Sequence, residues 1–373
     1  MKMTSAFLVF GTQAGAGQTT APCGRGSETE RILSRDQRER CLCNRFASSV
    51  GKVQAPDTSL RPAGVLLRSL LCLAFAATAL AQQSADDVRI HVEPVQHNIY
   101  LLAGAGGNVT VQVGSEGVLL VDTGLTPATP KLLAEIHKLS PGRVRYIINT
   151  HMHPDHVGGN VAIAKMFTDD PAQPLKIIGH ENVLNRLTAK VPGQPAFPEA
   201  GLPIDEYATA TKNLHFNGEA VIVYHEPNAH TDGDSVVLFR GADVISTGDI
   251  FTPDSYPFLD IERGGSVQGE IAALNHILQM TVPAHTQEGG TYVIPGHGRI
   301  CDDADVVEFR DMVVIIRDRV RDMVNKGMSL EQVKAARPSR DYDTEYVSSN
   351  SFVKADQFVE AIYKSLKQGG SSR

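Results

Sequence analysis

Three histidines and an aspartate crowd into one short stretch of the chain, from Thr150 to Asn160. Imidazole and carboxylate groups together form a ligand set for a borderline-soft divalent ion such as zinc. The candidate ligands in this stretch are His151, His153, Asp155 and His156. A solvated, histidine-rich loop is the alternative. It is disfavoured because residues of the same types recur downstream in order.

Further candidate ligands stand at or just beyond the carboxyl ends of apolar strands. They are Asp122, His230, Asp249 and His297. The strands expected before these residues and before the histidine cluster are 118–121, 219–225, 243–246, 292–294 and 144–148. The repeated pairing of a strand with a ligand indicates one assembled metal site.

The remaining pattern mixes strands with helices, which places the chain in the α/β class. A β pattern runs from residue 88 to 122, with strands over 92–102 and 109–113 joined by a glycine-rich turn at 103–107. An ordinary hairpin turn is favoured there over a mobile flap. The loop 191–203 is rich in proline and glycine and is predicted to form a wall of a pocket. Helices are predicted over 129–139, 160–167, 271–280, 306–325, 330–336 and 352–366.

The order and spacing of these motifs resemble the metallo-β-lactamase superfamily. The resemblance covers roughly residues 88–298 and implies an αββα sandwich, which we place at 85–300. A C-terminal helical extension is expected over 301–373. Within this resemblance, His151, His153 and His230 would bind one zinc ion.

The resemblance also assigns the other ligands. Asp155, His156 and His297 would bind a second zinc ion, and Asp249 would bridge the two. Asp122 corresponds to a carboxylate that orients ligands. Two such cations lower the pKa of a bridging water and supply hydroxide near neutral pH. Asp155 is additionally expected to act in catalysis, because it can orient this nucleophile and accept its proton.

The implied function is an exported di-zinc metallohydrolase that acts on a small-molecule ester, lactone, thioester or amide, β-lactams included. Asp249 stands where β-lactamases usually carry cysteine or serine, and so resembles the glyoxalase II, lactonase and phosphodiesterase branches. The alternative is a mononuclear iron oxygenase of the persulfide dioxygenase type, using His151, His230 and Asp249. A non-catalytic metal-binding protein is a third interpretation. Metal content separates the first two.

Several residues near these motifs have weaker functional interpretations. Tyr256, Phe258 and Asp260 are candidates for the substrate cleft, with core or loop packing equally open. Arg263 is expected to be an exposed loop residue. The other histidines of the later part of the chain are expected to be surface or internally satisfied residues: His91, His97, His137, His180, His215, His225, His276 and His285.

The charge distribution limits the partners. The first 81 residues carry ten Lys or Arg and five Asp or Glu, which leaves 25 and 37 for the remainder. This acidic remainder argues against nucleic acid as a partner, because phosphate binding requires a basic surface. The sequence is compatible with a homo-oligomer. Only Cys301 lies beyond residue 81, which excludes a disulfide framework there.

The N-terminal part differs from the rest. Residues 1–64 show no sustained hydrophobic period and are expected to be disordered, or an artefact of an upstream start codon. Residues 65–81 combine a basic flank, an apolar stretch and Ala79-Leu80-Ala81, which is typical of a secretory signal peptide. The apolar stretch is too short for a transmembrane helix. We therefore expect a secreted or periplasmic protein whose mature form starts near Gln82.

Overall fold

The structure is a computed structural model that describes residues 88–167, 172–190, 192–287, 289–348 and 351–370. The predicted N-terminal extension, 1–64, and the predicted signal peptide, 65–81, lie outside these residues. Within the described ranges no helix is both long and apolar enough to cross a membrane.

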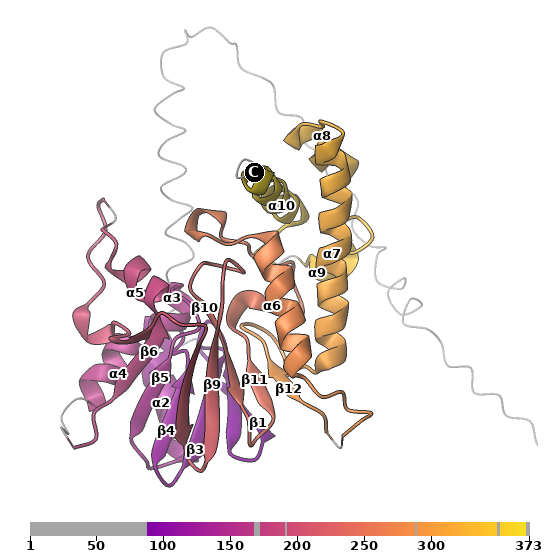
Figure 1. The fold of residues 1–373 in the computed structure, drawn as a ribbon. Coiled ribbons are helices and arrows are strands. Elements are labelled where there is room, and N and C mark those ends of the chain that lie inside the picture. Colours follow the sequence, from indigo (N-terminus) through magenta and orange to yellow (C-terminus); the bar gives the residue numbers. More distant parts are fainter. Residues whose placement is uncertain (1–87, 168–171, 191, 288, 349–350, 371–373) are drawn as a thin grey trace, which may run out of the picture. The chain divides into compact units, whose positions relative to one another are not determined.

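Two β-sheets form the centre of the fold (Figure 1). The first sheet has the order β1-β2-β3-β4-β5-β6-β7, antiparallel as far as β4 and parallel from there on. Its strands are β1 His91–Gln96, β2 Ile99–Ala103, β3 Val109–Gly114, β4 Gly117–Val121, β5 Val144–Ile148, β6 Lys176–His180 and β7 Asp205–Tyr207. The second sheet has the order β12-β11-β10-β9-β8 and is antiparallel except for the pair β11 and β12. Its strands are β8 Thr211–Phe216, β9 Glu219–Glu226, β10 Asp234–Phe239, β11 Val244–Ser246 and β12 Tyr292–Ile294.

Helices cover the outer faces of both sheets. The helices are α2 Thr129–Leu139, α3 Pro154–Val157, α4 Asn160–Phe167, α5 Glu181–Thr188, α6 Val267–Met280, α7 Asp303–Asn325, α8 Leu330–Ala336, α9 Asp343–Tyr346 and α10 Ala355–Gly370. Leu132 and Ile136 of α2 share a buried cluster with the outer face of the first sheet. The layers therefore follow the predicted αββα order.

Strand β4 shows why the sheets stack. Its side chains alternate between the two faces, as a strand requires. Val118 and Leu120 pack toward α2, whereas Leu119 and Val121 pack toward the second sheet. All four side chains are buried. Both faces of this strand are thus in apolar cores, which explains why its sequence is continuously apolar.

The C-terminal helices share a core with the second sheet. Val236 and Ile245 of that sheet belong to the same buried cluster as Phe309 of α7 and Phe358 of α10. Figure 1 draws these helices in orange to yellow on one side of the sheets. The predicted domain boundary at residue 300 stays a prediction, but the elements on its two sides are packed into one core.

The structure corrects several predicted elements. The predicted strand 92–102 is two strands, because His97 adopts a positive φ of 54° in a tight turn between β1 and β2. The helix predicted from Phe352 begins at Ala355, where the Gln357 side chain accepts a hydrogen bond from the Lys354 backbone N–H. Helix α5 and strands β7 and β8 were not predicted.

The fold brings the carboxyl ends of four strands to one edge. β4 and β5 run parallel in the first sheet, and β11 and β12 run parallel in the second. The backbone N–H of Ser235 donates to the Thr150 carbonyl, and that of Asn108 donates to the Gly296 carbonyl. These bonds connect the two sheets at this edge. The residues that follow the four strands consequently meet above this edge.

Candidate metal centre

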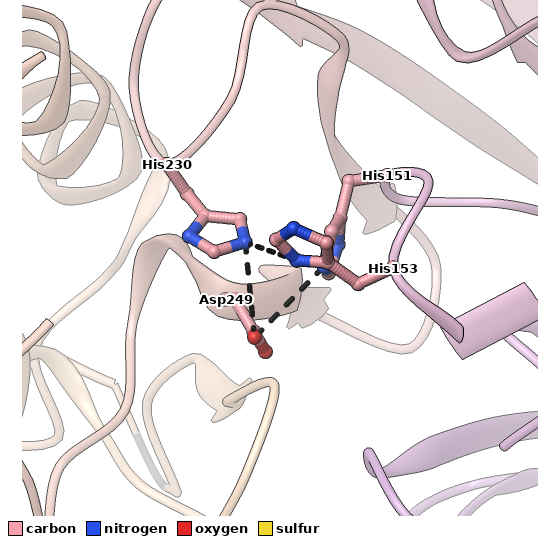
Figure 2. A group of neighbouring side chains, drawn as sticks. All are labelled: His151, His153, His230 and Asp249. Carbon is pink, nitrogen blue, oxygen red and sulfur yellow. Dashed lines mark hydrogen bonds and ion pairs between the residues drawn. The ribbon is translucent and has the colours of Figure 1, made fainter. Parts of the chain in front are cut away.

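The structure brings all seven predicted metal ligands together. His151, His153, His230 and Asp249 form one group, and Asp155, His156 and His297 form a second. Figure 2 shows the first group, whose three imidazoles and carboxylate converge from three separate segments: the loop after β5, the loop after β9 and the 3-10 helix Gly248–Ile250. Within each group the candidate ligand atoms lie within 4.8 Å of one another. The structure shows that these side chains converge. That they bind a metal ion stays a proposal.

The outer ring nitrogens of two histidines are held by polar partners. The Thr150 hydroxyl donates to Asp122, at 2.7 Å, and therefore accepts from His151 Nδ1, at 3.0 Å. His153 Nε2 lies 3.0 Å from Asp260 Oδ2, which fixes the ring from the other side. Both rings thus present their remaining nitrogen to the cluster with its lone pair free.

The other two buried histidines are held in the same way. His156 Nδ1 lies 2.7 Å from Asp122 Oδ2, and His230 Nδ1 donates to the Phe258 carbonyl. Asp122 itself adopts a left-handed φ of 64° and accepts from the Thr150 backbone N–H. This contact with His156 matches the orienting role that the resemblance implied for Asp122.

The inward-facing atoms have no adequate protein partners. His151 Nε2, His156 Nε2 and Asp249 Oδ1 are buried without a hydrogen bond. His153 Nδ1 and His230 Nε2 face each other at 2.9 Å, although both outer nitrogens are already used as donors. Buried polar atoms normally find partners, so the convergence of these orphaned ligand atoms fits a bound cation. The donor set fits a divalent ion with imidazole and carboxylate ligands.

Asp249 lies between the two groups. Its Oδ2 atom is 3.9 Å from both His151 Nε2 and His230 Nε2. Its Oδ1 atom is 3.1 Å from His156 Nε2 and 3.5 Å from His297 Nε2. Each carboxylate oxygen therefore faces a different group, which is the arrangement a bridging ligand needs.

Asp155 and His297 form the open side of the cluster. Asp155 Oδ2 is 3.2 Å from His297 Nε2, and both side chains are partly exposed. Burial raises the pKa of Asp155, but the hydrogen bond from His297 and the charge of His156 outweigh it and lower that pKa. Asp155 is consequently an ionised carboxylate at neutral pH and can accept a proton.

The charge preference differs between the two groups. Burial lowers the pKa of His151 well below its usual range and that of His230 to about 4, so both rings are neutral. Burial also opposes charge on His156 and His297, but Asp249 outweighs it. The pKa of His156 is raised well above its usual range, and that of His297 to about 9. The second group therefore attracts positive charge even without a metal ion.

The glycine-rich turn backs the cluster rather than serving only as a hairpin connection. A Cβ atom on Gly107 would lie 2.5 Å from the ring of His156. The Gly107 backbone N–H also donates to the Asp155 carbonyl at 3.0 Å. Only glycine permits this approach. The sequence predicted the turn but not its contact with the ligands.

Other residues of the site were not predicted from the sequence or were predicted without a definite role. Asp260 contacts His153 and also accepts from Arg263 at 2.8 Å, although it lies 107 residues beyond that histidine. Thr150, next to the first ligand, had no assigned role. The described residues of the loop 191–203 do not line the cavity beside the cluster, so its role as a pocket wall stays a prediction. Phe197 from that loop packs instead against Val157 and Val183.

The remaining histidines stay outside both groups. His180 and His225 stack with their ring centroids 3.5 Å apart, and His276 pairs with Glu226. These contacts agree with the prediction that such histidines have partners within the fold rather than a role in the metal site.

Comparison with known proteins identifies the family. The sequence profile of the metallo-beta-lactamase superfamily matches residues 94–297. The chain is 24% identical over 200 residues to a metallo-beta-lactamase type 2 from Bacillus sp., which covers 53% of this chain and 69% of the relative. It is 32% identical over 109 residues to a hydroxyacylglutathione hydrolase from Crocosphaera subtropica, covering 29% of this chain and 35% of the relative.

A solved structure supports the same assignment of the fold. The stereoselective inverting sec-alkylsulfatase from Pseudomonas sp. superposes with a TM-score of 0.55 at 16% identity, covering 74% of this chain and 50% of that one. The chain thus spans only half of the sulfatase and about a third of the hydroxyacylglutathione hydrolase. The fold and the His and Asp cluster, which could hold a metal ion, match a superfamily whose named relatives here are hydrolases. The chain belongs to the metallo-beta-lactamase superfamily, as its motifs predicted.

Proposed function

We propose that this protein is a hydrolase that holds two zinc ions and cleaves an ester, lactone, thioester or amide of a small molecule. The observation that carries the proposal is the set of buried, orphaned donor atoms facing one another across the two groups. The relatives named above are hydrolases by name, which supports the same reaction class.

The chemistry needs both the ions and the surrounding residues. When bound, two divalent cations lower the pKa of water lying between them and polarise the scissile carbonyl group. Asp155 orients the attacking water and accepts its proton, because it is ionised and borders the cavity. Asp122 and Asp260 hold two of the ligand rings in the required tautomer and orientation.

A mononuclear iron oxygenase that uses His151, His230 and Asp249 is the second candidate function. The structure also gathers Asp155, His156 and His297, and it turns Asp249 Oδ1 toward them, which fits a second ion. Because such oxygenases keep part of this motif, the presence of the second group does not decide between the two functions. Metal content separates them, with two zinc ions expected for the hydrolase and one iron ion for the oxygenase.

The test is turnover of a substrate panel with and without a chelator. The panel contains a chromogenic cephalosporin, a lactone, a thioester and a p-nitrophenyl ester. We expect at least one substrate to be hydrolysed, with activity lost to the chelator and restored by zinc. Hydrolysis that persists in the metal-free protein, or a fully zinc-loaded protein without activity on any of them, would contradict the proposal.

A further inference from the structure

A cavity of about 770 Å³ opens directly beside the metal cluster. Asp155 and Asp249 line it, and so do Phe352 and Val353 of the C-terminal extension. The volume lies within the range of small-molecule sites. The cavity borders Asp155 and Asp249, where the attacking water is proposed to lie. When the reacting group of a substrate is at that position, the rest of the substrate would occupy the cavity.

Aromatic side chains connect the cluster to the C-terminal extension. The Phe258 ring lies 5.8 Å from the ring of His153 and 5.7 Å from that of His230. Phe352 meets Phe258 edge to face, with ring centroids 5.4 Å apart. The Phe258 backbone is fixed because its carbonyl accepts from His230. Phe258 and Phe352 thus form an apolar wall of the cavity. The wall is attached to the candidate ligand His230 at Phe258 and extends to Phe352 in the C-terminal extension.

Large apolar side chains are exposed in this cavity to an unusual degree. Leu125, Phe258 and Phe352 are 37%, 38% and 74% exposed. They account for three of the seven exposed large apolar residues in the described part of the chain, and all three line the cavity. Scattered apolar residues are normal on a surface, but a gathered set marks a binding site.

The charges around the cavity exclude an anionic substrate tail. No lysine or arginine lines it among the residues that the structure describes. Asp254, which belongs to neither ligand group, adds negative charge. The nearby cations Arg263 and Arg299 are paired with Asp260 and Asp305. His297, whose pKa is raised to about 9, also lines the cavity, but it belongs to the ligand group and is paired with Asp155 and Asp249. A carboxylate or phosphate placed along Leu125, Phe258 and Phe352 would therefore have no unpaired cation as a partner.

We propose that the substrate carries an uncharged, apolar acyl or alkyl group that lies along Leu125, Phe258 and Phe352. The inference rests on the proposed hydrolase function and specifies its substrate class. It also assigns the C-terminal extension a role in substrate recognition.

The kinetic test compares p-nitrophenyl esters with acetyl, butanoyl, hexanoyl and octanoyl groups on the zinc-loaded full chain. We expect kcat/KM to rise by about fourfold for each buried methylene. A glutarate monoester, whose acyl group ends in a carboxylate, should be hydrolysed more slowly than the butanoyl ester. No dependence on chain length, or faster turnover of the glutarate ester, would overturn the inference while leaving the hydrolase proposal intact.

Two variants locate the effect. Phe352→Ala should reduce the ratio of kcat/KM for the octanoyl ester to that for the acetyl ester by about tenfold. The matched control is Ile204→Ala, because Ile204 is 73% exposed and lies outside the cavity lining. This control should leave the ratio unchanged. Equal ratios in the two variants would contradict a substrate contact by Phe352.

A binding measurement keeps the inference testable if no ester is hydrolysed. Nile red, a neutral apolar dye, should bind the wild-type protein with increased fluorescence and be displaced by octanamide but not by glutarate. Phe352→Ala should weaken dye binding, and Ile204→Ala should not. Equal dye binding by both variants would overturn the proposal. So would a wild-type dimer that dissociates in Phe352→Ala, because a second copy of the chain would then cover the wall.

Discussion

At the scale of single residues, the site depends on which atom of each side chain is left free. The outer nitrogens of four histidines are committed to Thr150, Asp260, Asp122 and the Phe258 carbonyl. The inner nitrogens therefore face the cluster, where a metal ion would take their lone pairs. This division explains why candidate ligands can be buried together without a protein partner for their inner atoms.

Asp155 offers the first test of a catalytic role. Asp155→Ala should lower kcat by about 10²–10⁴-fold, because it removes the proton acceptor beside the nucleophile. The residue is in a short helix at a preformed loop, so the thermal midpoint should stay close to that of the wild-type protein. Circular dichroism and turnover of the best panel substrate check both expectations. Near-full turnover by the folded variant would rule out this role.

Asp260 tests the support of a ligand. Asp260→Asn keeps the shape but removes the charge that holds His153, so metal affinity should fall by about 10–100-fold. Glu262→Gln is the control, because Glu262 is exposed and contacts no candidate ligand among the described residues. Competition with a chromogenic chelator measures the affinity. Equal affinity in both variants would show that His153 does not need this carboxylate.

At the scale of elements, parallel strand pairs explain why ligands distant in sequence meet. Residues after β4, β5, β11 and β12 share one edge because each pair runs in one direction. The strand before each ligand could be predicted, since each is a short apolar run. β8 was missed because only Leu214 and Phe216 are apolar in its six residues, and it lies at the edge of its sheet. Helix α5 did carry a signal, Val183 and Leu187 four residues apart.

The glycine turn between β2 and β3 gives a prediction at this scale. In Gly107→Ala the new methyl group would collide with the His156 ring, so the second group should be displaced. We expect this variant to lose metal from that group while the other ion is retained. Gly142→Ala is the control for a general effect of replacing glycine, because its contacts are with Ser140 and Gly117. Unchanged metal content in Gly107→Ala would show that the ring can move without loss of the site.

At the scale of the whole molecule, the αββα layers and the ligand set were predictable because they depend on local patterns. The residues that orient those ligands could not be predicted. Asp260, for example, lies 107 residues after His153 in the sequence, and only the assembled fold brings the two side chains together. The cavity wall was predicted in part: Tyr256 and Phe258 had been candidates for the substrate cleft and do line the cavity, whereas Phe352 had been expected inside a helix. Its exposure follows from the later start of α10.

The stacked histidines predict how the whole fold responds to acid. Burial and the charge of His225 lower the pKa of His180 from 6.5 to about 4. Between these pH values the unfolded chain binds a proton that the folded chain refuses, so stability falls as pH decreases. We expect a loss of about 1–2 kcal/mol, below the full value of the shift because solvent screens the pair.

His180→Asn is the matched variant for this prediction. Asparagine keeps a side-chain acceptor for the Asn182 backbone N–H at the start of α5 but cannot titrate. Urea unfolding of the chelator-treated proteins at several pH values separates this effect from metal release. The variant should lose less stability than the wild type over the same window. Parallel curves would exclude His180 as the source.

The metal content of the purified protein, measured by inductively coupled plasma mass spectrometry, tests the proposed metal centre directly. We expect two zinc ions per chain, and fewer in Asp249→Ala because that side chain faces both groups. One iron ion per chain would favour the oxygenase instead. A protein that binds no metal after incubation with zinc would contradict the proposal that these seven side chains form a metal centre.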